Sequence, residues 1–225
     1  MKLSDLTTIQ KNDLFNTLRV SITHHSSAIE GISLTFGETK RLLEFGMTAE
    51  SKPLHEQLVV IGFASAFDFV IREASNTGSL LDADLVKDVH AILFDKALSV
   101  SPERVERPIG SWRKDDRYIK GVDIKLSEPK FIDQDLNNLI YRYDRKLDLN
   151  DIAAFHIDFE LIHPFADGNG RVGRLLMTYQ AIKNNYIPPL ILNDNRLDYL
   201  ESLGDKDELE KFLDLSIQNS IDLVR

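Results

Sequence analysis

The sequence contains no cysteine. Disulfide bonds and a cysteine nucleophile are therefore excluded, and a chain without thiols fits a reducing compartment. The N-terminal stretch MKLSDLTTIQKNDLF lacks the apolar core of a signal peptide. No apolar run reaches the roughly 18 residues that a membrane helix needs. We therefore expect a cytoplasmic protein without a membrane partner.

Positive charge is also scarce. The chain has 27 Lys and Arg residues against 36 Asp and Glu residues, which gives a formal net charge of -9. Nucleic acids and anionic membranes attract basic surfaces, so neither is an expected partner. Any phosphate group that the protein binds must then be held by local positive charge.

Internal repeats, low-complexity tracts and a linker rich in proline or glycine are absent from the sequence. The chain has 225 residues, of which 43% are hydrophobic. That length and composition suffice for one sizeable core. We expect a single domain over residues 1–225.

Apolar residues recur at helical spacing through most of the chain, which predicts an all-α fold. We expect helix caps at Thr35, at Asp82 and at either Asn150 or Asp151. The last amphipathic helix, around residues 209–217, either closes the core or forms the contact of a homodimer. The other expected helices cover residues 13–30, 35–46, 54–74, 81–94, 133–143 and 151–162, with a further one that begins close to Gly170 or Arg171.

The helical period is lost between residues 111 and 131. Within this stretch, β-branched residues surround a glycine, which predicts a small β-hairpin. An isolated two-stranded hairpin is marginal in water, so this one should rest on the helices. Its candidate residues are Tyr118, Ile119, Lys120, Gly121 and Val122, followed by Asp123 and Ile124.

The stretch His163–Arg174, which reads HPFADGNGRVGR, combines residue types that no hydrophobic core needs. A helix is expected to end at His163, because Pro164 disfavours helical geometry in the residue before it. The glycines then open the next helix. Free N–H groups and the positive end of the dipole make such a turn an anion site, and glycine lets a phosphate approach the backbone.

Four charged or titratable side chains of this stretch complete a site for nucleotide chemistry. Arg171 and Arg174 lie three apart in the first helical turn and would hold two further phosphate groups. Asp167 is the oxygen ligand that a magnesium ion bridging phosphates would use. His163 remains as the general base. A helix C-terminus favours a protonated imidazole, so this role requires neighbours that deprotonate His163 or a modest pH optimum, and the sequence leaves both protonation states open.

The same twelve residues resemble the signature of the Fic-domain family, with every defining position filled. The resemblance implies a Fic-type helical bundle that transfers AMP from ATP to a Ser, Thr or Tyr hydroxyl of a protein, including the protein itself. It implies that His163 is the catalytic base and that Asp167 holds Mg²⁺. The ATP-binding residues are then Gly168, Asn169, Gly170, Arg171 and Arg174.

A second segment, Ser26-Ser27-Ala28-Ile29-Glu30-Gly31, lies in the expected helix of residues 13–31. It resembles the inhibitory motif of the Fic class with an N-terminal inhibitory helix. The resemblance implies that Glu30, together with Ser26, reaches the active site and takes Arg174 away from the γ-phosphate of ATP. In some relatives this glutamate orients a water that removes AMP from the target, so inhibition and hydrolysis both stay open here.

The family resemblance also gives the hairpin a role. Residues 111–131 match the region of the flap, which holds a target segment by main-chain pairing in the manner of β-strand addition. The target-docking residues would be Tyr118 to Val122.

Two rival functions remain. A phosphotransferase branch of the family has a lysine in the glycine-rich turn, where this chain has Gly170 and then Arg171. A catalytically quiet nucleotide-binding module locked by Glu30 is the non-enzyme alternative, although His163 and Asp167 are complete. A metal hydrolase built from His24, His25 and His163 has no supporting spacing.

Overall fold

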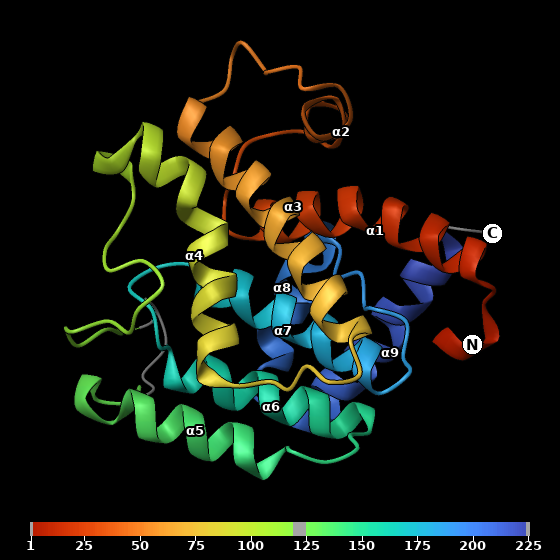
Figure 1. The fold of residues 1–225 in the computed structure, drawn as a ribbon, viewed down its shortest axis with the longest axis vertical. Coiled ribbons are helices and arrows are strands. Elements are labelled where there is room, and N and C mark those ends of the chain that lie inside the picture. The colour runs from red at the N-terminus through yellow and green to blue at the C-terminus, as the bar shows by residue number, and fades with distance from the viewer. Residues whose placement is uncertain (1, 119–124, 224–225) are drawn as a thin grey trace.

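The computed structural model describes residues 2–118 and 125–223, and in them the chain is helical without a strand. Short 3-10 turns separate several of the α-helices (Figure 1). The α-helices are α1 (Thr8–Ile29), α2 (Phe36–Phe45), α3 (Leu54–Ser75), α4 (Ala83–Val100), α5 (Ile132–Arg142), α6 (Leu149–Ile162), α7 (Asn169–Lys183), α8 (Arg196–Ser202) and α9 (Lys206–Asp222). The predicted all-α fold is confirmed for these residues.

Helix α7 is the centre of the molecule. It contacts α1, α3, α4 and α6, and Figure 1 shows these helices around it. All but Gly170 and Lys183 of its residues are buried. A helix that is buried all round needs neighbours on every side. The glycine-rich turn that starts α7 is therefore fixed in place by the whole bundle.

Most of the predicted helices begin at side-chain caps. Thr35 accepts a hydrogen bond from Glu38 N in a capping box, and Asp82 accepts one from Leu85 N, both as predicted. The predicted cap of α6 was wrong, because Asp148 caps this helix. Asp151 instead occupies the third helical position, where its carboxylate turns back to Asp148 N and pairs with Arg145.

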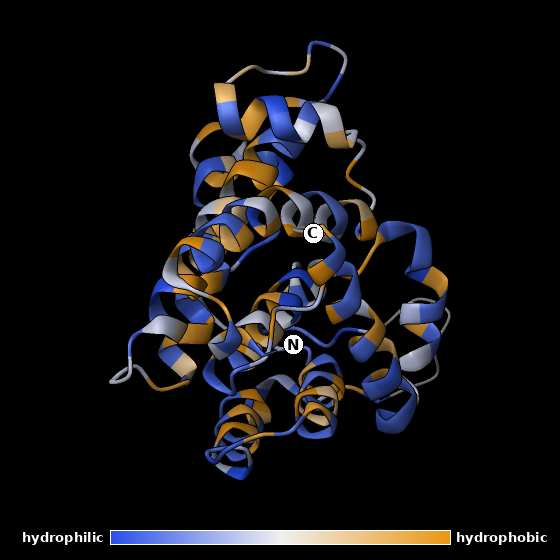
Figure 2. Cartoon of the chain, turned by 90° about the vertical axis from the view of Figure 1, so that its right-hand side faces the viewer, coloured by the Kyte–Doolittle hydropathy of each residue, from blue (hydrophilic) through white to orange (hydrophobic). Residues whose placement is uncertain are grey.

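Hydrophobic and hydrophilic residues alternate along the helices, as amphipathic packing requires (Figure 2). Helix α9 packs on α6, and its residues Leu209 and Leu213 are fully buried. Helix α9 thus closes the core, which is one of the two roles expected for it. Helix α8 was not predicted, because its seven residues give too short a period to recognise.

Helix α3 has the length and mean hydropathy of a membrane-spanning helix, a feature not predicted from the apolar runs of the sequence. It also packs against α1, α4 and α7. Half of its most apolar 18-residue window is buried inside the protein. The buried half of this window forms part of the core.

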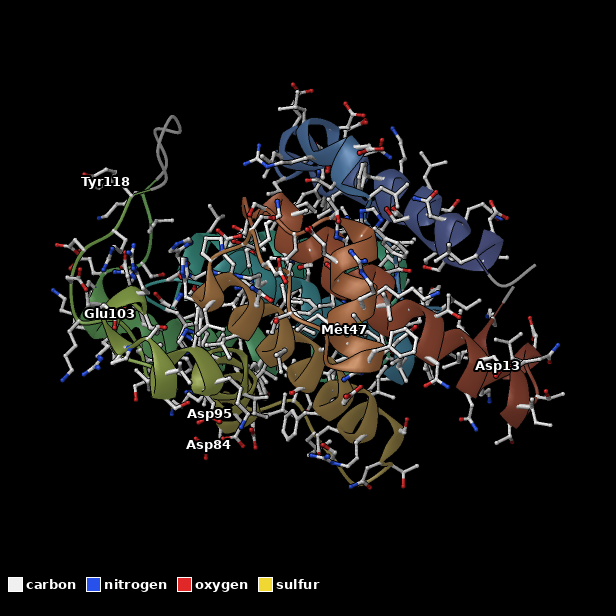
Figure 3. All side chains as sticks on the ribbon, turned by 90° about the horizontal axis from the view of Figure 1, so that it is seen from above. Asp13, Met47, Asp84, Asp95, Glu103 and Tyr118 are labelled. Atoms are coloured by element: carbon white, nitrogen blue, oxygen red, sulfur yellow. The ribbon has the colours of Figure 1, made fainter. Side chains whose placement is uncertain are left out.

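The predicted hairpin falls mostly on residues 119–124, which lie outside the described part of the chain. Tyr118 is described, and its side chain is 86% exposed at the edge of the molecule (Figure 3). The adjoining residues 112–114 and 125–128 have no regular secondary structure.

Candidate active site

His163 ends α6 in a left-handed conformation, with φ 51° and ψ 59°. Its main-chain N–H still donates to Phe159 O at 3.0 Å, and Pro164 follows it. Positive φ is uncommon outside glycine and is often found where the surroundings impose it at a functional site. The conformation turns the chain from α6 toward the start of α7.

Asn169 closes the loop between these two helices. Its side chain accepts from Phe165 N at 2.8 Å and donates to Phe165 O at 2.9 Å. The amide is buried and used within the loop. The side chain of Asn169 is thus engaged within the loop, and its part in ATP binding stays a prediction that concerns its main chain.

His90 and Arg113, two buried side chains that were not predicted as site residues, hold this loop from outside. His90 accepts from Gly110 N through Nδ1 and thus donates from Nε2 to Asp167 O at 3.1 Å. Burial lowers the pKa of His90 to about 4, which keeps this tautomer neutral. Arg113 donates to His163 O at 2.7 Å. The helical period of α4 gave His90 only a packing role, and the loop position of Arg113 carried no signal.

The glycine-rich turn forms the N-terminus of α7, where Gly168 is the cap residue and supplies no side chain. The first N–H groups of α7 are thus available to an anion. At Gly170 a Cβ atom would lie 2.5 Å from Glu30 Oε1 and 3.1 Å from Arg174 Nη1. The absence of a side chain at Gly170 leaves room for a negatively charged group, and the Glu30 carboxylate lies there.

Arg171 pairs with Asp167 inside the loop. Its Nη2 donates to Asp167 Oδ1 at 2.9 Å, and the guanidinium lies over the ring of Phe94. The Arg171 side chain is 7% exposed, and its Nε has no hydrogen-bond partner among the described residues. A buried donor without a partner is costly, so Arg171 is suited to a further anionic ligand.

Arg174, one turn further along α7, is bound by α1. It donates from Nε to Ser26 Oγ at 2.7 Å, and from Nη2 to Ser26 O at 3.0 Å and to Glu30 Oε1 at 2.7 Å. Burial raises the pKa of Glu30, but the positive charges of Arg174 and Arg171 outweigh it and hold that pKa below its usual range. Glu30 is therefore ionised, and the predicted meeting of Ser26, Glu30 and Arg174 occurs in the structure.

Three polar side chains lie behind Arg174, of which His156 and Tyr199 are buried. His156 and Tyr199 share a hydrogen bond of 2.7 Å between Nε2 and the hydroxyl oxygen. Burial raises the pKa of Glu160 to about 7, although the charge of Arg174 opposes this. A Cβ atom at Gly173 would lie 2.7 Å from Glu160 Oε1, so glycine permits this close approach of α6 to α7. The sequence patterns gave no sign of this layer.

The pKa of His163 is lowered, mainly because burial disfavours the charged imidazole. The nearby Glu160 carbonyl raises it, whereas the charge of Arg113 lowers it again. The sequence left the protonation state of His163 open. In the folded protein burial favours the neutral imidazole, which is the form that a general base needs.

The carboxylate of Asp167 fits a magnesium ion that also binds phosphates. Its side chain is 45% exposed, at the mouth of the glycine-rich turn. Mg²⁺ is commonly held by one or two carboxylates, substrate phosphates and water. No group of three or more His, Asp or Glu side chains that could hold a metal by themselves occurs in residues 2–118 and 125–223.

The residues of the rival metal hydrolase are engaged elsewhere. His25 accepts from Asn193 N at 3.1 Å, and His24 lies 3.3 Å from Thr39 Oγ1. Neither forms a metal-binding group with His163 in the described chain. The structure gives that rival no support.

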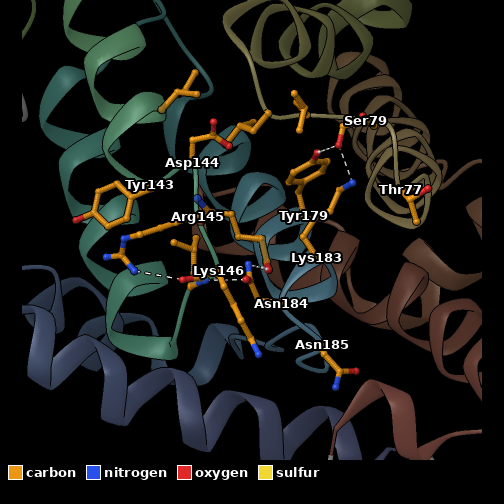
Figure 4. Close-up of a pocket in the computed structure, with 15 residues that line it drawn as sticks. Thr77, Ser79, Tyr143, Asp144, Arg145, Lys146, Tyr179, Lys183, Asn184 and Asn185 are labelled. Carbon is orange, nitrogen blue, oxygen red and sulfur yellow. Dashed lines mark hydrogen bonds between the residues drawn. The ribbon is translucent and has the colours of Figure 1, made fainter.

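A pocket of about 400 Å³ lies at the other end of α7 (Figure 4). There Tyr179 and Lys183 donate to Ser79 O at 3.1 and 2.6 Å. None of the predicted site residues that the structure describes lines this pocket. Its volume therefore does not mark the active site, which the packed residues around Glu30 fill.

The chain is similar to known proteins over most of its length. A model of the Fic/DOC family matches residues 80–181. The protein adenylyltransferase fic-1 of Caenorhabditis elegans is 28% identical over 186 residues, which cover 80% of this chain and 35% of that protein. The protein adenylyltransferase Fic of Drosophila melanogaster is 27% identical over 215 residues, which cover 89% of this chain and 41% of that protein. The chain thus spans about a third to two fifths of these relatives.

Solved structures share the fold. A Fic domain containing signaling protein from Bacteroides thetaiotaomicron superposes with a TM-score of 0.85 at 19% identity, covering 99% of this chain and 92% of that one. Residues 134–508 of Fic-1 from C. elegans give a TM-score of 0.80 at 24% identity, and the match covers 98% of this chain and 67% of that one.

Proposed function

Because the chain belongs to the Fic/DOC family, we propose that it is a protein adenylyltransferase that moves AMP from ATP to a Ser, Thr or Tyr hydroxyl of a protein. Its relatives named above carry that activity in their names. The observation that carries the proposal is the neutral imidazole of His163 beside a glycine-rich turn with two arginines. This arrangement joins a base to a phosphate site.

The phosphates of ATP lie over Gly168 and Gly170, where the N–H groups at the start of α7 stabilise negative charge. Arg171 binds them through its unused Nε donor, and Arg174 binds the γ-phosphate once Glu30 has moved. Asp167 would hold Mg²⁺, which supplies neutralisation of the phosphate charge when bound.

The reaction is a displacement at the α-phosphorus. His163 takes the proton of the target hydroxyl, whose oxygen forms a bond to that phosphorus. The bond from the α-phosphorus to the bridging oxygen breaks, and pyrophosphate leaves with the negative charge that Arg171 stabilises. Positioning and charge stabilisation supply most of the catalysis in phosphoryl transfer. Residues 111–131 are proposed to present the target.

Glu30 inhibits this reaction in the proposal. The carboxylate bonds to Arg174 and fills the space beside Gly170. A bound γ-phosphate would compete for the same guanidinium and would be repelled by the ionised carboxylate. Release of Glu30 is thus required for productive ATP binding.

The direct test is labelling with α-³²P-ATP and Mg²⁺. Wild type should label itself faintly, Glu30→Gly strongly, and Glu30→Gly with His163→Ala not at all. Label that enters only from γ-³²P-ATP would support the phosphotransferase instead. Equal labelling of wild type and Glu30→Gly would refute inhibition, and no labelling of any sample or added protein would favour the quiet module.

Removal of AMP is the second candidate activity, because the Glu30 carboxylate lies beside the phosphate site. Protein labelled by the Glu30→Gly variant can be purified and mixed with wild type or with Glu30→Gln. Faster release of AMP by wild type would assign hydrolysis to Glu30, and equal release would leave Glu30 with inhibition alone.

A further inference from the structure

Arg113 is a buried arginine, 2% exposed, in the segment between α4 and α5. Among the residues that the structure describes, its guanidinium donates only to main-chain carbonyls. Nε donates to His163 O at 2.7 Å, Nη1 to Asp115 O at 2.7 Å, and Nη2 to Ser127 O at 2.5 Å and to Ile162 O at 3.5 Å. Five N–H donors in a rigid fork permit this arrangement.

Two of these acceptors are the last carbonyls of α6 and its cap. The end of a helix leaves such carbonyls without a partner, and a positive charge there is favourable. The main chain adds two more links, from Arg113 N to Pro164 O at 2.9 Å and from Ser127 N to Leu161 O at 3.3 Å. The end of α6 is therefore held by residues that are distant in sequence.

No carboxylate of residues 2–118 or 125–223 forms an ion pair with Arg113. Direct neutralisation of its charge is thus absent in this part of the chain. Burial lowers the pKa of Arg113, whereas Asp116 and Asp115 raise it from a greater distance. The positive field of the guanidinium consequently reaches the imidazole of the residue whose carbonyl it binds.

We propose that Arg113 is a positioning residue for the catalytic imidazole: its guanidinium fixes the left-handed cap at His163 and places a positive charge at the carbonyl of that residue. The inference rests on the adenylyltransferase function proposed above. Lysine cannot reproduce these contacts, because a single ammonium group does not reach all the carbonyls that the planar guanidinium binds.

Other charged groups also face His163. Arg117 lies in the same segment as Arg113, and its charge also lowers the pKa of His163. Glu30 of α1 raises it, as does the Glu160 carbonyl of α6. The test must therefore separate the contribution of Arg113 from these three.

The experiment uses Arg113→Lys and Arg113→Met in the full chain that carries Glu30→Gly. Arg145→Lys is the matched control, because Arg145 makes a two-bond contact with Asp151 near the other end of α6. We expect both Arg113 variants to lower kcat for self-labelling about 10- to 100-fold with little change in KM for ATP. Circular dichroism and Mg·ATP binding report whether each variant is folded.

NMR titration of the His163 imidazole, assigned with His163→Ala, supplies a readout that needs no activity. Arg113→Met should raise the pKa of His163 and move the acidic limb of the kcat/KM profile to higher pH. Arg113→Lys should raise it less, because the charge is kept. The control should change neither quantity.

An unchanged His163 titration and kcat in a folded Arg113→Met variant would overturn the proposal. If all proteins are inactive but the titration moves as expected, the proposed function fails while the positioning of His163 by Arg113 stands. If Arg113→Met does not fold, Arg113→Lys decides, and a kcat equal to that of Arg145→Lys would refute the positioning role.

Discussion

Arg171 and Arg174 lie three residues apart on α7, and each pairs with a carboxylate. Arg171 binds Asp167, four residues earlier in the same loop and helix start. Arg174 binds Glu30, which belongs to α1 and is 144 residues away in sequence. One pair is built into the motif, whereas the other exists only while α1 is docked.

The two pairs therefore have different consequences. The Asp167 contact holds Arg171 at the phosphate site and persists whatever α1 does. The Glu30 contact occupies Arg174, and Ser26 holds the same guanidinium through two further hydrogen bonds. Local pairing organises a catalytic group, and long-range pairing can switch one off.

The largest expected effect comes from breaking the local pair. Asp167→Asn, in a chain that also carries Glu30→Gly, removes the proposed Mg²⁺ ligand and the partner of Arg171. We expect self-labelling to fall about 100-fold or more, since charge stabilisation dominates phosphoryl transfer. Rates measured across a Mg²⁺ titration check this.

Asp158→Asn is the control for that variant, because Asp158 pairs with Arg142 on the exposed side of α6. Its labelling rate should match that of the parent. If Asp167→Asn keeps the parent rate at every Mg²⁺ concentration, the assignment of Asp167 as the metal ligand is wrong.

Breaking the long-range pair should have a smaller effect of opposite sign. Glu30→Gln keeps the shape of the side chain but removes its charge. The Glu30 side chain is 34% exposed, so the ion pair is worth about 1–2 kcal/mol, or roughly tenfold in ATP affinity. The affinity can be measured by calorimetric titration in the presence of Mg²⁺, with an ATP analogue that resists cleavage at the α-phosphorus.

Glu56→Gln is the matched control for this variant, because Glu56 accepts hydrogen bonds from Ser33 just beyond α1 and lies outside the site. It should bind the analogue as wild type does. Tighter binding by Glu56→Gln than by Glu30→Gln would show that loosening of α1, and not the lost charge, admits the nucleotide.

The smallest effect on activity is expected at Glu160, where the change falls on stability instead. Glu160 is a carboxyl near Arg174 that does not form an ion pair with it. The pKa of Glu160 is raised to about 7 from an ordinary 4.5. Between these two pH values the unfolded chain releases the proton while the folded chain keeps it, so stability falls as pH rises. Glu160→Gln should remove this loss, which is at most about 3 kcal/mol.

Urea unfolding at pH 5, 6, 7 and 8 tests this sign. The stability of Glu160→Gln relative to wild type should increase from pH 5 to pH 7 and then level off. Other buried groups, such as His156, are common to both proteins and cancel in the difference. Glu103→Gln, on the surface, is the control for an exposed carboxyl. A difference that does not vary with pH would mean that Glu160 is ionised in the folded protein.

Patterns of neighbouring residues predicted most of the helices and the loop that carries the site. Capping residues and apolar spacing placed most of the helices. The exceptions are the cap at Asp148, the short α8, the start of α1 at Thr8 and the end of α4 at Val100, which lie well outside the predicted 13–30 and 81–94. The site residues of His163–Arg174 form one loop and helix start as expected. Asn169 differs, because its side chain is used to close the loop.

His90, Arg113 and Glu160 escaped prediction for one physical reason. Each acts on a partner brought close by folding, and its own neighbours in sequence carry no trace of that partner. The protonation state of His163 could not be predicted for the same reason, because burial in the folded protein is the main cause of its lowered pKa.

The sequence by itself determined the chemistry: an imidazole before a proline, a glycine-rich turn and two arginines at helical spacing are fixed by covalent order and local backbone preference. Only the tertiary structure decided the protonation state of the imidazole and the partner of the second arginine. Burial leaves His163 neutral, and the docking of α1 delivers the Glu30 carboxylate to Arg174. Desolvation and long-range ion pairs depend on distances that exist only once the helices have packed.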